Sequence, residues 1–176
     1  MAPENPYQTL IGAAWEGLPA GLRLSHQVPL RAIGNLNVFR ATRGLAGIMS
    51  RLLLLPPAGE NVRVSLVIEQ TDHGIQWNRT FGKEKVDTRH TFQRGFFFEH
   101  MGPFALQFRL EVLQDSILIQ QLGITAFGLP LPRWIGPRVT GKVTPGLDEA
   151  RWHIDVQIRH DWFGDVCRYH GIMRAE

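Results

Sequence analysis

The stretch FALQFRLEV, residues 104–112, carries the longest regular alternation of apolar and polar side chains in the chain. Its even positions are all apolar, while Gln107, Arg109 and Glu111 occupy odd positions between them. Successive side chains of a β-strand point to opposite faces, so a period of two predicts one buried and one solvated face. This stretch therefore predicts a half-buried strand, and it is the clearest indication of the fold class.

Other stretches on both sides of residues 104–112 also predict strands, by the same period or, at Ile117–Ile119, as an apolar run, and turn residues such as Asp72-His73-Gly74 separate them. They are Val62–Glu69, Ile75–Phe81, Ile117–Ile119, Trp152–Ile158 and Asp165–Met173. No helical pattern separates these strands, which disfavours parallel βαβ units. We therefore expect a mainly β (α+β) fold: a curved antiparallel sheet or β-barrel of about eight to ten strands with two N-terminal helices.

The helical N-terminal part is expected within residues 6–55, and the antiparallel β meander over residues 62–174. Apolar spacings of three and four predict a first helix from about Pro6 to Glu16, followed by a break and a short second turn. A period of two interrupts the helical pattern over residues 28–42, with a bend or bulge at Gly34. The length of 176 residues fits a single domain, 1–176, because two cores would each be small.

The second helix is expected from Gly44 to Leu55, where Pro56 and Pro57 end it. Its predicted buried face consists of Leu45, Ile48, Met49, Leu52 and Leu53. The apolar stretch 45–55 is interrupted by Arg51 and is too short to cross a bilayer, so no membrane span is expected.

Charge and cysteine content exclude several classes of function. The net charge is only +3, and Glu84 and Asp87 interrupt the one basic cluster, formed by Arg79, Lys83, Lys85 and Arg89. Nucleic acid is therefore not an expected partner, and this cluster is interpreted as a solvated hairpin rim.

Cys167 is the only cysteine, which excludes an intramolecular disulfide and a cysteine-rich zinc site. A reducing, cytoplasmic location is favoured. Residues 1–10 contain Glu4 and no basic segment, so no signal peptide is expected. His153, His160 and His170 are spread too widely to indicate a metal triad, and no metal is expected.

Short segments along nearly the whole chain carry a resemblance to a known family. They are Gly17-Leu18-Pro19, Leu55–Gly59 (LPPAG), Trp77 with Arg79, Glu99–Phe104 (EHMGPF), Gly128–Pro132 (GLPLP) and Arg168–Gly171 (RYHG). The chain resembles a bacterial domain family of unknown function, found alone or at the C-terminus of saccharopine-dehydrogenase-like oxidoreductases. The resemblance implies a compact β-rich domain and no established activity. It offers an oxidoreductase as a partner, but no Gly-x-Gly-x-x-Gly follows a strand, so no cofactor is expected.

Acid/base candidates occur on two predicted strands and at a turn. Asp155 and His153 share one strand face, where an Asp can orient a His as a general base or both can face water. Glu99 and His100 precede a turn and form a second carboxylate–imidazole pair, with solvated side chains as the alternative. Tyr169 is the fifth candidate, while Cys167 is read as a small buried residue.

Aromatic and arginine side chains are the candidates for holding a ligand. They are Arg109, Trp77, Phe108, Trp134, Trp152 and Arg168. Trp134 belongs to the segment FGLPLPRWIGP, residues 127–137, which is too rich in proline and glycine for a regular element. This segment is read as a lid, as a contact patch for a partner or membrane surface, or as a packed connection.

Three functions follow from these patterns. The leading hypothesis is a β-barrel-like domain that binds an apolar or amphipathic small organic molecule. The alternative is a cofactor-independent enzyme, a cyclase, isomerase or hydrolase, that uses the same pocket. The third is a docking module for an oxidoreductase that uses residues 127–137. Alternation identifies two faces of each strand, but it leaves open which face encloses a ligand.

Overall fold

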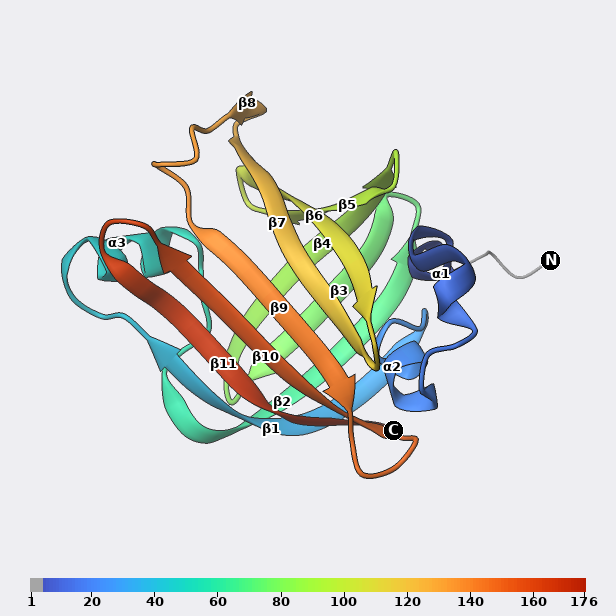
Figure 1. Cartoon of the computed structure of the whole chain (residues 1–176). Coiled ribbons are helices and arrows are strands. Elements are labelled where there is room, and N and C mark those ends of the chain that lie inside the picture. Colours follow the sequence, from blue (N-terminus) through green and yellow to red (C-terminus); the bar gives the residue numbers. More distant parts are fainter. Residues whose placement is uncertain (1–4) are drawn as a thin grey trace.

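Ten antiparallel strands close into a barrel in the computed structural model, which describes residues 5–176 (Figure 1). They are β1 (Leu30–Arg40), β2 (Gly59–Thr71), β3 (Gly74–Phe81), β4 (Glu84–Gln93), β5 (Phe96–Met101), β6 (Phe104–Leu113), β7 (Ser116–Ala126), β9 (Arg138–Pro145), β10 (Arg151–His160) and β11 (Gly164–Ala175). Each strand pairs with the next in this series, and β11 returns to pair with β1. The short β8 (Leu129–Pro130) pairs only with β7. The signal-peptide expectation rests partly on residues 1–4, which lie outside the described range.

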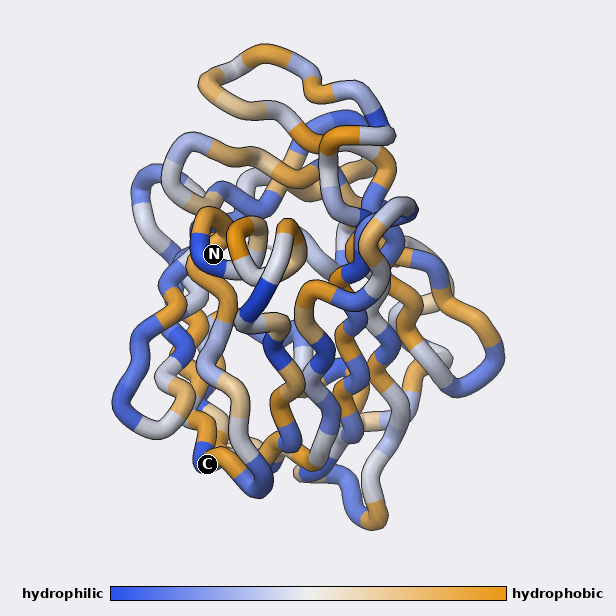
Figure 2. Tube along the Cα trace, turned by 90° about the vertical axis from the view of Figure 1, so that its left-hand side faces the viewer, coloured by the Kyte–Doolittle hydropathy of each residue, from blue (hydrophilic) through white to orange (hydrophobic). Residues whose placement is uncertain are grey.

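The mainly β fold and the barrel are therefore confirmed, and the stretch that indicated them is β6. Leu106 and Phe108 of β6 are buried inside, whereas Arg109 lies outside. Orange and blue segments alternate along the other strands in the same way (Figure 2). Apolar side chains thus fill the interior because each strand offers one apolar face to it.

Strands β4, β5 and β9 were not anticipated individually, and β4 shows why. Its inward face contains Thr88 and His90 as well as Val86, while its outward face contains Lys85 and Asp87. Both faces are therefore partly polar, and the alternation that marks a half-buried strand is hidden.

The N-terminal segment closes one end of the barrel (Figure 1). Helix α1 (Pro6–Ile11) continues into the 3-10 turn η1 (Gly12–Trp15), and α2 (Ala20–Ser25) follows the break, as the spacing indicated. Tyr7 of α1 and Leu22 of α2 are fully buried. Strand β1 then divides the part expected to be helical, 6–55, into two.

Helix α3 (Gly44–Leu52) connects β1 to β2 at the other end of the barrel (Figure 1). Its predicted buried face is right for Leu53, which is buried, and for Met49, which packs against the core, and wrong for the other three residues. Leu45, Ile48 and Leu52 are exposed, whereas Gly47 and Ser50 are buried. The reason is close contact: Ser50 Oγ lies 2.8 Å from the Ala41 carbonyl oxygen, and a side chain at Gly47 would collide with Thr42. No helix within residues 5–176 is long and apolar enough to cross a membrane.

Gly34 allows β1 to approach β11 closely. A Cβ at this position would lie against the Ile172 carbonyl oxygen and 2.6 Å from Met173 Sδ. We predict that Gly34→Ala lowers the free energy of unfolding by about 1–3 kcal/mol, because the strand pair would have to move apart. Urea unfolding measures this change. Gly17→Ala is the control, since its Cβ would meet only one atom, at 3.7 Å. Equal stability of both variants would contradict the prediction.

Candidate functional site

The barrel encloses a cavity of about 140 Å³. Most of the side chains around it are apolar, including Leu36, Val64, Leu66, Phe81, Val143 and Val156. A smaller set of polar residues lines the same space: Ser25, His26, Arg79, His90, Glu99 and Tyr169. The cavity has room for several water molecules or for a small organic group.

An ion pair lies on the inner wall where three neighbouring strands meet. Arg79 of β3 donates to Glu99 Oε1 of β5 at 2.7 Å, and both side chains are 16% exposed. Thr88 of β4 donates to the same oxygen at 2.9 Å. Antiparallel pairing produces this arrangement, because inward positions of adjacent strands lie side by side. The three residues therefore form one hydrogen-bonded unit.

Two hydrogen bonds connect the N-terminal helix to Trp77 and His90, which lie beside this ion pair. Trp77 Nε1 donates to the Tyr7 hydroxyl at 2.8 Å, and that hydroxyl lies 2.6 Å from His90 Nδ1. His90 Nε2 lies 3.6 Å from Glu99 Oε1. The indole can only donate, so we assign the Tyr7 hydrogen to His90 Nδ1, the arrangement that gives this hydrogen an acceptor and leaves the imidazole proton on Nε2. We call Tyr7, Trp77, Arg79, Thr88, His90 and Glu99 the inner polar cluster.

Burial and charge shift the pKa values of these groups. Burial by itself would raise the pKa of the Glu99 carboxyl, but Arg79 and His90 together outweigh it and hold that pKa well below its usual range. Burial lowers the pKa of His90, and it lowers the pKa of His26 to about 4. Burial also raises the pKa of Tyr169 to about 12. The cavity wall therefore holds one balanced ion pair and neutral imidazoles.

Two nitrogen atoms of the inner polar cluster are buried without a hydrogen-bond partner among residues 5–176: Arg79 Nε and His90 Nε2. Buried polar groups are normally paired, and an unpaired donor costs about 1–3 kcal/mol. A hydrogen-bond acceptor between these groups would therefore stabilise the cluster.

The structure brings five of the predicted site residues to the inner face. Trp77, Trp152, Phe108, Glu99 and Tyr169 all line the cavity. Phe108 stacks on Phe97 with ring centroids 5.0 Å apart. Of the acid/base candidates, only Glu99 and Tyr169 belong to this set.

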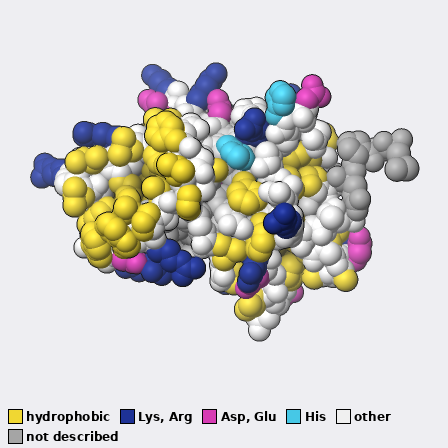
Figure 3. Space-filling view, turned by 90° about the horizontal axis from the view of Figure 1, so that it is seen from above, with side chains coloured by type: hydrophobic (Ala, Val, Ile, Leu, Met, Phe, Trp, Pro, Cys, Tyr) yellow, Lys and Arg dark blue, Asp and Glu magenta, His cyan; other side chains and the backbone are white. Residues whose placement is uncertain are grey.

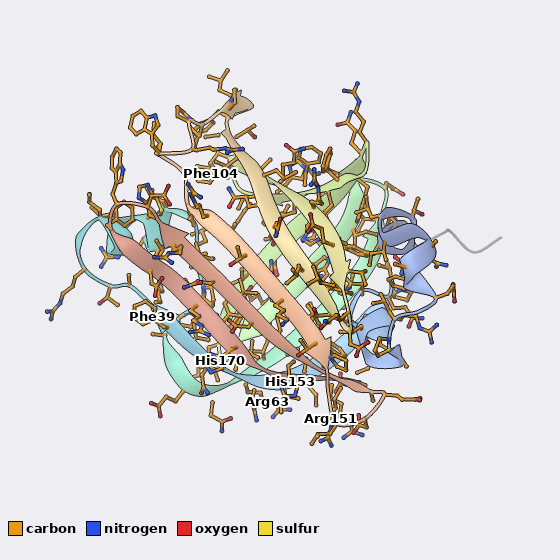
Figure 4. All side chains as sticks on the ribbon, in the orientation of Figure 1. Phe39, Arg63, Phe104, Arg151, His153 and His170 are labelled. Carbon is orange, nitrogen blue, oxygen red and sulfur yellow. The ribbon has the colours of Figure 1, made fainter. Side chains whose placement is uncertain are left out.

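The remaining candidates lie on the outer surface. Asp155 pairs with Arg168 at 2.9 Å, and both side chains are exposed by nearly half. His153, two residues before Asp155 on the same face of β10, also projects outward (Figure 4). His100 contacts Thr91 at 2.9 Å on the outer face of β4 and β5. Arg109 is also outside, 3.6 Å from Glu111. The structure therefore separates these residues from the cavity.

Sequence reasoning missed four members of the inner polar cluster, and one of them had been assigned elsewhere. They are Tyr7, Arg79, Thr88 and His90. The prediction of a solvated rim is wrong for Arg79, because Trp77, Arg79 and Phe81 share the inward face of β3. Arg79 lies two residues from Trp77 and from Phe81, and this spacing could have predicted that it shares their face of the strand. Nothing in the sequence indicated that Tyr7 reaches His90, which is 83 positions away.

Residues 127–137 cover the core with Leu131, which packs against the cluster of Phe97, Leu106, Phe108 and Ile124, but not with their other large side chains. Phe127, Leu129 and Trp134 are exposed, and Trp134 stacks on Trp162 with ring centroids 5.5 Å apart. Cys167 is fully buried, and burial raises the pKa of its thiol to about 12, consistent with a packing role. Within the described chain, no three His, Cys, Asp or Glu side chains gather as a metal site.

We predict that stability falls below neutral pH because His26 is neutral in the folded barrel. Its pKa is about 4 when folded and about 6.5 when unfolded, so the unfolded state binds more protons as the pH falls. From about pH 7 to pH 5, wild type should lose about 2 kcal/mol more than His26→Gln. Urea unfolding across this range measures the difference. His153→Gln, which changes an exposed histidine, should retain the wild-type pH dependence. Parallel curves for wild type and His26→Gln would refute this account.

The Arg79–Glu99 pair generates a second prediction. Glu99→Gln should lower the free energy of unfolding by about 3 kcal/mol, since the Arg79 charge stays buried without its partner. The double variant Arg79→Met, Glu99→Leu should lie within about 1 kcal/mol of wild type, because it removes both charges. Glu111→Gln at an exposed pair is the control and should change stability little. A double variant as unstable as the single one would show that the pair itself stabilises the fold.

Comparisons with known proteins give one family match and two similar solved structures. A structure of a protein with unknown function from the DUF3598 family of Nostoc punctiforme has a TM-score of 0.51 at 13% identity, covering 84% of this chain and 50% of that one. The chain therefore spans about half the length of that relative, and the likeness concerns the fold. A secretary abundant heat soluble (SAHS) protein from Ramazzottius varieornatus has a TM-score of 0.44 at 8% identity, and the match covers 84% of this chain and 94% of that one. No curated protein matches the sequence. The family model DUF4166, a domain of unknown function, matches residues 18–173, and the chain belongs to this family.

Proposed function

We propose that the barrel binds a small amphipathic organic molecule in its interior. The observation that carries this proposal is the inner polar cluster, with two unpartnered nitrogen atoms, on an otherwise apolar cavity wall. Binding pockets commonly combine apolar walls with a few placed polar groups that orient the ligand. The apolar part of the ligand would lie along Leu66, Val143 and Val156.

The charges of the cluster restrict the polar group of the ligand. Arg79 is already balanced by Glu99, and the lowered pKa of His90 keeps its ring neutral. Both unpartnered nitrogens carry hydrogens in this arrangement. A neutral acceptor, such as a carbonyl or hydroxyl oxygen, therefore suits the cluster better than a carboxylate.

A cofactor-independent enzyme is the second candidate, and the Tyr7–His90–Glu99 chain favours it. A histidine that is hydrogen-bonded to a hydroxyl, with a carboxylate 3.6 Å from its other nitrogen, has the groups that general acid/base catalysis uses. Asp155 and His153 lie outside the barrel, so His90 and Glu99 replace them as the residues to test.

Native mass spectrometry of the purified protein, followed by denaturing extraction, tests for a retained molecule. A stoichiometric adduct with an acceptor group and an apolar body is expected. Incubating that molecule with wild type and His90→Gln then separates carrier from enzyme. A product formed only by wild type would establish catalysis, while an unchanged molecule would support binding alone.

A larger side chain inside the cavity tests whether the ligand binds there. Ile154 lines the cavity, whereas Ile172 is exposed on the outer face of the neighbouring strand. We predict that Ile154→Trp weakens binding of prodan, a neutral naphthalene ketone, by about tenfold or more. Ile172→Trp should bind it as wild type does. Fluorescence titration gives both affinities, and equal affinities would place the probe outside the barrel.

A further inference from the structure

Helix α3 presents its apolar side to solvent. Leu45, Ile48 and Leu52 follow one another at spacings of three and four, and they are 64%, 54% and 63% exposed. The opposite side of the helix contains Gly47 and Ser50, which are buried against the barrel. A surface helix normally directs its apolar side toward the core. This helix packs Ala46 and Met49 against the core but leaves its three largest aliphatic side chains in solvent, so they are available to a partner.

Two exposed tryptophans extend this surface beyond the helix. Trp162, 70% exposed, lies at the turn between β10 and β11, and α3 packs against β11. Trp134, 54% exposed, stacks on Trp162, and an ion pair between Arg138 and Asp161 at 2.7 Å holds the same two segments together. We call Leu45, Ile48, Leu52, Leu54, Trp134 and Trp162 the apolar rim.

The space-filling view from above shows this gathering directly (Figure 3). Hydrophobic side chains collect over the end that carries α3, and their border holds several Lys and Arg side chains and fewer Asp and Glu side chains. Isolated exposed apolar residues are common on proteins, whereas a contiguous patch marks an interaction site.

Positive charge predominates in the segments that form the apolar rim. Residues 40–59, which include α3, contain Arg40, Arg43 and Arg51 and no acidic residue. Residues 116–147, which include Trp134, contain Arg133, Arg138 and Lys142 and no acidic residue. Asp161, beside Trp162, is already paired with Arg138. The surface therefore combines apolar side chains with unbalanced positive charge, including the exposed Arg43 and Arg51.

We propose that the apolar rim docks the barrel on the surface of an anionic lipid bilayer. The leucine and isoleucine side chains of α3 would enter the boundary of the acyl chains, and the two tryptophans would lie at the level of the headgroups. Arg43, Arg51 and Arg133 would contact lipid phosphates, each adding attraction to a negative surface. A second copy fits this face less well, because a symmetric pair would place like charges against each other.

Vesicle flotation tests the proposal with the full chain. Wild type should float with vesicles of phosphatidylglycerol and phosphatidylcholine and stay behind with phosphatidylcholine alone. Tryptophan emission should shift to the blue on binding, since Trp134 and Trp162 are exposed while Trp15 and Trp152 are already buried. Added salt should weaken binding by screening the arginines.

Matched variants identify the surface. The triple variant Leu45→Ser, Ile48→Ser, Leu52→Ser should weaken vesicle binding by about tenfold or more. Leu147→Ser is the control, since Leu147 is 88% exposed in the turn between β9 and β10 and lies outside the apolar rim. Arg43→Gln with Arg51→Gln should also weaken binding, whereas Arg94→Gln, in the turn between β4 and β5, should not. Circular dichroism confirms that each variant is folded.

Three results would overturn the proposal. The first is wild type that floats with neither vesicle, and the second is a triple variant that floats as well as wild type. The third is a wild-type dimer in solution that the triple variant loses, which would assign the apolar rim to a second copy. Prodan binding inside the barrel is measured separately, so docking and ligand binding can fail independently.

Discussion

Closure of the barrel is the constraint on which the rest of this structure depends. Strand β7 completes it by pairing with both β6 and β9, although the pairing with β9 extends over only four residue pairs, from Ile117 to Gln120. Beyond them the Gln121 side chain accepts a hydrogen bond from the Val139 amide. Because every barrel strand is paired on both sides, each inner side chain is removed from bulk water. An inner polar group must then find its partner within the barrel.

The inner polar cluster follows from that requirement. Glu99 accepts from Arg79 and Thr88, and His90 reaches the Tyr7 hydroxyl on the helix that closes the barrel end. Such an arrangement is expensive to bury, and an apolar wall of equal volume would be as stable. We therefore connect the cluster with a ligand rather than with stability. The same groups would orient a bound molecule or exchange a proton with it.

The two ends of the barrel differ in how they are covered. The N-terminal helices bury Tyr7, Trp15 and Leu22 and seal one end. At the other end α3 buries Gly47 and Ser50 and exposes its leucines. An apolar cavity and an apolar, basic surface thus occur in the same small protein.

The sequence by itself determined the antiparallel β class, because strands such as β6 and β10 each keep one apolar face. It also marked the N-terminal helix and its break. Tertiary structure decided which face is enclosed, and so separated Glu99 and Tyr169 inside from Asp155 and His153 outside. A period of two describes both faces equally, and only closure of the sheet makes one of them the interior. The contact between Tyr7 and His90, likewise, depends on the helix docking over the barrel end, which no local pattern encodes.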